Sequence, residues 1–118
     1  MKQINLSVVI PAYNEEARIL DSLKKILAHL RKKGYSFEII VVDDGSSDDT
    51  VQVARKIKDK RLRVITYSKN KGKGYAVKTG MLAAKNRLAL LCDADLSTPI
   101  EELDNFMKFI KNYDIIGG

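Results

Sequence analysis

Cysteine, histidine and long apolar runs are almost missing from this sequence of 118 residues. The one cysteine, Cys92, cannot form a disulfide within the chain, and its apolar surroundings are typical of a small buried side chain. The one histidine, His29, has no second histidine to join it, which argues against a zinc site. No apolar run approaches the roughly 18 residues of a membrane-spanning helix, and the N-terminus lacks a signal-like apolar segment. These absences predict a cytoplasmic protein.

The composition is that of one globular domain, residues 1–118, with 45% hydrophobic and 31% charged residues. The net charge of +6 is compatible with a nucleic acid, an anionic membrane or a phosphorylated ligand. Many basic residues, such as Lys24, Lys25, Arg55 and Lys56, fall at predicted helix positions, which favours solvated helix faces. Basic and aromatic residues are not interleaved, as they are in proteins that bind single-stranded nucleic acids.

Apolar runs alternate with helical periodicity along the whole chain. Strands are predicted at 6–10, ended by Pro11, and at 37–42, 62–67, 88–92 and from Asp114. Helices are predicted at about 15–33, from Ser47 or Asp48 through Ile57, at about 75–86, and from Pro99. This order predicts an α/β fold: a Rossmann-like, mainly parallel sheet flanked by helices. The strand at 88–92 is expected to be buried on both faces.

Polar residues follow three of these strands, and in parallel sheets ligands bind beyond the carboxyl ends. Carboxylates there repel one another unless a cation or a hydrogen-bond donor lies between them. Asp93 and Asp95 are one residue apart, so they can aim two oxygen ligands at Mg²⁺ or Mn²⁺ beside a substrate phosphate. An N-cap role for Asp95 in the next helix is an equal alternative.

The glycine-containing loop at 71–74 fits neither a dinucleotide fingerprint nor a P-loop, because it lacks the third glycine of the first and the Gly-Lys-Ser/Thr ending of the second. Its backbone N–H groups and lysines precede a predicted helix, which suits an anion. An ordinary turn explains the same pattern equally well.

Four segments together closely resemble the nucleotide-binding half of family 2 glycosyltransferases with the GT-A fold. They are VVIPAYNEE at 8–16, VVDDGSSDDT at 41–50, NKGKG at 70–74 and DADL at 93–96. The extension DADLSTP at 93–99, together with NKGKG at 70–74, is most similar to the dolichyl-phosphate glucosyltransferase branch, with polyprenyl-phosphate mannosyltransferases second. The resemblance covers essentially the whole chain.

The resemblance implies a donor site made of residues from all four segments. The base and ribose pocket would be lined by Pro11, Ala12, Tyr13, Asn14 and Glu15. Asp43 or Asp44 would hydrogen-bond the base, beside the turn at Gly45 and Ser46. The donor would also lie near Lys71, Gly72 and Lys73, and near Asp93, Ala94 and Asp95. Asp93 would face the ribose or the metal, and Asp95 would hold Mg²⁺ or Mn²⁺ on the diphosphate.

The implied reaction transfers a hexose from a nucleotide sugar, with UDP-glucose favoured, to dolichyl phosphate or another polyprenyl phosphate at the cytoplasmic face of a membrane. A GDP-mannose-dependent mannosyltransferase is one alternative. Family members are longer, and their second half supplies acceptor contacts and often the catalytic base, so no base is assigned here. The other alternative is therefore a donor- and metal-binding module that is catalytically incomplete alone. A homodimer is expected if an exposed sheet edge needs cover, and a nucleic acid is not expected.

Overall fold

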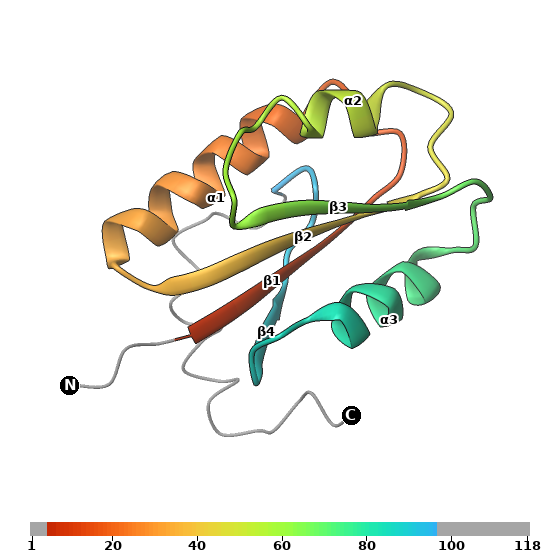
Figure 1. Ribbon diagram of the computed structural model, residues 1–118. Coiled ribbons are helices and arrows are strands. Elements are labelled where there is room, and N and C mark those ends of the chain that lie inside the picture. Colours follow the sequence, from red (N-terminus) through yellow and green to blue (C-terminus); the bar gives the residue numbers. More distant parts are fainter. Residues whose placement is uncertain (1–4, 97–118) are drawn as a thin grey trace.

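The computed structural model describes residues 5–96, which form a four-stranded parallel sheet in the order β3-β2-β1-β4 (Figure 1). The strands are β1 (Asn5–Ala12), β2 (Ser36–Asp44), β3 (Leu62–Tyr67) and β4 (Leu88–Leu91). Helices α1 (Ile19–Lys33) and α2 (Thr50–Ala54) lie on one face of the sheet, and α3 (Lys73–Ala83) lies on the other (Figure 1). The predicted parallel sheet with helices on both faces is confirmed.

The two central strands are buried on both faces, because each face is covered by helices. Alternate residues of β1 therefore belong to different clusters: Val8 packs on the α1 side and Val9 on the α3 side. The apolar stripe of α1 is fully buried in the first cluster and includes Ile19, Leu23, Ile26 and Leu30. The helix ends at Gly34, as predicted, in the left-handed conformation with φ 72°.

Helix α3 approaches the sheet closely through the small residues Ala76 and Gly80, which are its buried residues. A Cβ added to Gly80 would lie 2.3 Å from Cγ1 of Val9 and 3.1 Å from Cγ2 of Val42. Both valines are fully buried, so neither side chain has room to move away. Gly80 is therefore required by this packing.

We expect Gly80→Ala to lower the free energy of unfolding by about 1–2 kcal/mol, because overpacking outweighs the gain in helix propensity. Gly74→Ala is the matched control in the same helix, since its added Cβ meets nothing within 4 Å. The control should leave stability unchanged or raise it by up to about 1 kcal/mol. Urea unfolding of both variants measures the difference, and equal stabilities would contradict the close packing of α3.

The sequence predicts that the first strand ends at Pro11, but β1 continues through Pro11 to Ala12. The carbonyl of Val9 accepts a hydrogen bond from the Cys92 N–H at 3.0 Å, so Val9 faces β4. Two residues later the nitrogen of Pro11 faces the same side, past the last β1–β4 pair. Its missing N–H therefore costs no ladder bond, and proline is tolerated in a central strand.

Each of the three helices also differs from the prediction in at least one boundary. Helix α1 begins at Ile19 instead of Glu15, and residues 15–18 form a turn in which the Arg18 N–H donates to the Glu15 carbonyl at 3.0 Å. The Glu15 and Glu16 N–H groups donate to side chains of the 48–50 loop. Helix α2 ends at Ala54, and the chain then tightens into i→i+3 turns, so Ile57 packs on the core from outside the helix. Helix α3 starts earlier and ends earlier than predicted, at Lys73 and Ala83.

Strand β4 is less buried than predicted, since Leu91 is 39% exposed and only β1 pairs with it among the described strands. The predicted helix from Pro99 and the predicted strand from Asp114 lie outside the described residues. None of the helices described is long and apolar enough to cross a membrane.

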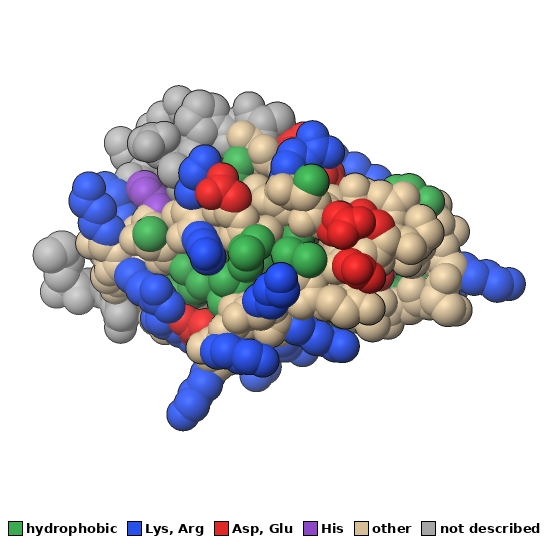
Figure 2. All heavy atoms as spheres, turned by 90° about the horizontal axis from the view of Figure 1, so that it is seen from above, with side chains coloured by type: hydrophobic (Ala, Val, Ile, Leu, Met, Phe, Trp, Pro, Cys, Tyr) green, Lys and Arg blue, Asp and Glu red, His purple; other side chains and the backbone are tan. Residues whose placement is uncertain are grey.

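Lysine and arginine side chains are spread over much of the face that carries α1 and α2 (Figure 2). Arg55 and Lys56 follow α2 instead of lying on it, so the predicted helix face does not account for them. Near them Asp59 accepts hydrogen bonds from Arg61 and Arg31, and these hold the pKa of its carboxyl well below the usual range. Part of the positive charge is thus neutralised locally.

Candidate active site

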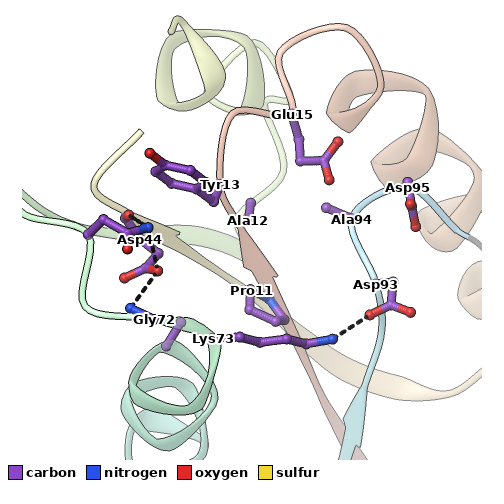
Figure 3. Close-up of a pocket in the computed structure, with 12 residues that line it drawn as sticks. Pro11, Ala12, Tyr13, Glu15, Asp44, Gly72, Lys73, Asp93, Ala94 and Asp95 are labelled. Carbon is purple, nitrogen blue, oxygen red and sulfur yellow. Dashed lines mark hydrogen bonds and ion pairs between the residues drawn. The ribbon is translucent and has the colours of Figure 1, made fainter. Parts of the chain in front are cut away.

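A cavity of about 580 Å³ opens at the carboxyl ends of the strands, beside the start of α3 (Figure 3). The residues that line it come from β1, β2, the β4 end and α3. They are Pro11, Ala12, Tyr13, Glu15, Asp44, Asn70, Gly72, Lys73, Ala76, Asp93, Ala94 and Asp95. The topology therefore brings parts of all four sequence segments to one pocket, where the strand-end rule predicts a ligand site.

One wall of the pocket is the turn after β4, which carries Asp93, Ala94 and Asp95. The turn is closed by a hydrogen bond of 3.0 Å from the Leu96 N–H to the Asp93 carbonyl, and Leu96 has φ 49°. Lys73, from the first turn of α3, reaches across the pocket, and its Nζ lies 3.3 Å from Oδ1 of Asp93 (Figure 3). The wall thus presents carboxylates opposite a lysine.

The donor set of this wall suits a hard divalent cation. Asp93 and Asp95 both line the pocket, and carboxylate oxygens are the ligands that Mg²⁺ and Mn²⁺ prefer. Within residues 5–96 no group of three or more His, Cys, Asp or Glu side chains is placed to hold a metal by itself. A cation here would take its other ligands from a substrate phosphate and water, as Mg²⁺ commonly does. The residues fit a metal shared with the substrate.

Asp44, on the opposite wall, accepts four hydrogen bonds through its carboxylate and is 3% exposed. Oδ1 accepts from the Tyr67 hydroxyl at 2.7 Å and the Lys71 N–H at 2.9 Å. Oδ2 accepts from the Asn70 side-chain amide and the Gly72 N–H, both at 3.0 Å. Burial, followed by the hydrogen bond to Asp44, raises the pKa of Tyr67, so this phenol stays a donor. The Asp44 carboxylate therefore holds residues 70–72 of the loop between β3 and α3.

Asp43, its neighbour, is as deeply buried, but its carboxylate has fewer hydrogen-bond donors. Its Oδ2 accepts from the Thr66 hydroxyl at 2.9 Å and from the Ser46 N–H at 3.4 Å. Its Oδ1 is buried and has no hydrogen-bond partner among the described residues. A buried carboxylate oxygen without a donor is costly, and this one lies outside the lining of the pocket.

Asn14 and its neighbours fasten the loop after β1 to the loop after β2. The Asn14 Oδ1 accepts from the Ser47 N–H at 2.9 Å, and the Asn14 N–H donates to the Ser46 hydroxyl at 2.8 Å. The Glu15 N–H donates to the Thr50 hydroxyl at 2.9 Å. Asn14 adopts φ 53°, a left-handed conformation that asparagine tolerates better than most residues. These residues shape the rim of the pocket.

The site predicted from the sequence divides into two groups. Most of its residues line the pocket, and ten of them are labelled in Figure 3. Those outside the lining are Asn14, Asp43, Gly45, Ser46 and Lys71. The prediction missed Asn70 and Ala76, which do line it. Asn70 belongs to the recognised segment 70–74, whereas Ala76 carries no signal beyond its place in the first turn of a helix.

Cys92 lies beside the pocket but is not a nucleophile. It is 8% exposed, and burial, with a smaller contribution from the charge of Asp93, raises the pKa of its thiol to about 11. The reactive thiolate is thus scarce at neutral pH. The sequence prediction of a small buried side chain is confirmed.

The sequence of residues 7–118 matches the family described as Glycosyl transferase family 2. The chain belongs to this family. The family 2 domain is 41% identical over 117 residues to a dolichyl-phosphate beta-glucosyltransferase from Drosophila melanogaster, with 92% of this chain and 36% of that protein covered. The chain thus spans about a third of the length of the curated relatives it matches.

Solved structures of glycosyltransferases share the fold of this family 2 domain. The mannosyltransferase PcManGT from Pyrobaculum calidifontis, in complex with GDP-Man and Mn²⁺, has a TM-score of 0.77 and 27% identity over 93% of this chain and 33% of its own. TarS from S. aureus, residues 1–349 with UDP-GlcNAc, has a TM-score of 0.70 and 30% identity over 93% and 32%. The domain therefore has the GT-A fold of these enzymes.

Proposed function

We propose that this family 2 domain binds a nucleotide-diphosphate sugar, with UDP-glucose favoured, for transfer of the hexose to dolichyl phosphate or a similar lipid phosphate. The observation that carries the proposal is the pocket itself, in which Asp93 and Asp95 lie opposite Lys73 at the start of α3. The name of the Drosophila melanogaster relative supports the acceptor and the sugar. Transfer at the cytoplasmic face of a membrane stays a prediction.

The nucleoside end of the donor would occupy the side formed by Pro11, Ala12 and Tyr13. Tyr13 is 47% exposed and its ring stands at the pocket, where it can stack on a base (Figure 3). Uracil and guanine both carry an N–H that can donate to a carboxylate. The acceptor we assign to that N–H is a carboxylate at the end of β2, Asp43 or Asp44, of which Asp44 lines the pocket.

The diphosphate would lie between the turn after β4 and the start of α3. Asp93 and Asp95 would hold Mg²⁺ or Mn²⁺ there, and the cation would stabilise, as a Lewis acid, the charge that develops on the nucleoside diphosphate. Lys73 is 66% exposed at its side chain and can turn from Asp93 to a phosphate oxygen. It then adds a cation where negative charge grows as the bond between the sugar and the phosphate breaks.

Two alternatives have their own support. A GDP-mannose donor is supported by the mannosyltransferase from Pyrobaculum calidifontis, which was solved with GDP-Man and Mn²⁺. A module that binds the donor but does not complete transfer is supported by the coverage, since the chain spans only 36% of its Drosophila melanogaster relative. A homodimer stays a prediction; the exposed apolar side chains available to it include Leu82 and Leu91.

Isothermal titration of the purified chain with UDP-glucose and with GDP-mannose, each with and without Mn²⁺, tests the proposal. We expect one donor to bind, and to bind more tightly with Mn²⁺, which identifies the nucleotide. A transfer assay with dolichyl phosphate then separates the complete enzyme from the donor-binding module. If neither donor binds under any metal condition, the proposed donor site is wrong.

A further inference from the structure

The segment at 41–50 ends in residues that the proposed donor site does not use. Among them, Thr50 is the first residue of α2 and is fully buried, although its side chain is polar. A buried hydroxyl is stable only where hydrogen bonds replace those that it made with water. The contacts of this hydroxyl therefore show what Thr50 does.

The hydroxyl of Thr50 joins the start of α2 to the loop after β1. Its Oγ1 accepts a hydrogen bond from the Glu15 N–H at 2.9 Å and donates to Oδ1 of Asp48. The same Oδ1 accepts from the Thr50 N–H at 3.0 Å, and Oδ2 of Asp48 accepts from the Glu16 N–H at 3.2 Å. Because a hydroxyl has one proton, the bond to Asp48 leaves the lone pairs of Oγ1 to the Glu15 N–H. Asp48 thus orients the Thr50 hydroxyl.

Glu15, unlike Thr50, lines the pocket. Its side chain is 18% exposed, and its carboxylate points toward Ala94 (Figure 3). The Arg18 Nε donates to Oε1 of Glu15 at 2.9 Å, and the Glu15 carbonyl accepts from the Arg18 N–H at 3.0 Å. These two bonds hold Glu15 from the α1 side, and Thr50 holds its N–H from the α2 side. The Glu15 carboxylate is therefore a fixed acceptor at the pocket.

We propose that Thr50 is a positioning residue, which holds the Glu15 backbone from the start of α2 and thereby aims the Glu15 carboxylate at the ribose hydroxyls of the donor. This inference rests on the proposed function, because it assumes a nucleotide in the pocket. Thr50 itself does not line the pocket. Its substitution must therefore affect the ligand through the residues that it contacts.

The test compares Thr50→Val with Thr50→Ser. Valine has no acceptor for the Glu15 N–H, whereas serine keeps the hydroxyl. In Thr50→Val we expect amide hydrogen exchange at Glu15 to accelerate about tenfold or more, and the affinity for UDP or GDP with Mn²⁺ to fall about tenfold. In Thr50→Ser both quantities should stay within about threefold of the unmutated chain. Exchange followed by NMR and isothermal titration measure them.

The 2′,3′-dideoxy form of the same nucleotide separates positioning from a general loss of structure, since it offers Glu15 no ribose hydroxyl. The unmutated chain should bind it about tenfold more weakly than the parent nucleotide, and in Thr50→Val this difference should shrink to about threefold or less. Thr79→Val is the matched control, because the Thr79 hydroxyl donates within α3, to the Tyr75 carbonyl at 2.8 Å, and Thr79 does not line the pocket. It should keep both affinities within about twofold.

The amide of Cys92, bonded to Val9 in the sheet, reports whether each variant keeps its fold. Undiminished nucleotide binding by Thr50→Val would overturn the inference and leave the proposed function intact. An equal loss for the nucleotide and its dideoxy form would overturn it too, because Thr50 would then only support the fold. Weaker binding with unchanged exchange at Glu15 would have the same meaning. If the unmutated chain binds no nucleotide, the proposed function itself fails, and this inference fails with it.

Discussion

Replacing Asp95 by asparagine should weaken Mn²⁺-dependent binding of the nucleotide sugar by about 30-fold. Two unit charges 4 Å apart attract by about 4 kcal/mol at an effective dielectric constant of about 20. Asp95 lies at the exposed rim of the turn after β4, so we take about half of this value, which corresponds to roughly 30-fold. Titration of the variant with the donor and Mn²⁺ measures the loss.

The matched control is Asp49→Asn, which removes the same charge at the same edge of the sheet. Asp49 is exposed, does not line the pocket, and makes no side-chain hydrogen bond as the N-cap of α2. It should bind the donor and Mn²⁺ within about twofold of the unmutated chain, as expected for a screened surface charge. An equal loss in the two variants would mean that only the general field of the edge matters, and the metal site would be refuted.

The same pair of variants decides between the two interpretations of Asp95 that the sequence leaves open. A residue that only caps the following helix would, on substitution, lower the free energy of unfolding by about 1 kcal/mol or less, since asparagine is itself a good N-cap. It would leave the effect of Mn²⁺ on donor binding unchanged. A metal ligand shows the opposite result, with the Mn²⁺ effect lost and metal-free stability retained.

The elements of the fold were predictable because local pattern and burial agree. Strand β3 begins and ends at the predicted residues, and the apolar stripe of α1 is the one that the helical period indicates. The carboxylates at the ends of β2 and β4 were correctly placed at one edge, because all strands of a parallel sheet end there. Periodicity and topology together therefore located the pocket.

The roles of individual residues within the motifs were not predictable in the same way. The Asn14 side chain accepts from the N–H groups of Ser47 and Asp48, and the Asp44 side chain accepts from donors in residues 67–72. Such bonds join segments about thirty residues apart, and no local period or propensity encodes them. The 48–50 loop likewise takes the N–H groups of Glu15 and Glu16, which precede α1. A motif can thus mark residues that hold loops as well as residues that touch a ligand.

Gly45→Ala should lower the free energy of unfolding by about 2–4 kcal/mol, which is more than the loss expected for Gly80→Ala. An added Cβ would lie 2.5 Å from the Asn70 nitrogen and from the Lys69 carbonyl carbon, and 2.9 Å from the Lys69 oxygen. These are backbone atoms of the loop that Asp44 binds, so they cannot move aside without breaking those hydrogen bonds. The left-handed φ of 68° adds strain that alanine does not relieve.

Gly34→Ala separates the two contributions to this loss. Gly34 has nearly the same φ, 72°, but an added Cβ there meets nothing within 4 Å. Its variant should lose about 1 kcal/mol from strain alone, and the remainder in Gly45→Ala then measures the clash with the loop. Urea unfolding gives both values. If the two variants were equally stable, Gly45 would not be in contact with the backbone of Lys69 and Asn70. The loop between β3 and α3 would then be held at this end by its hydrogen bonds to Asp44 alone.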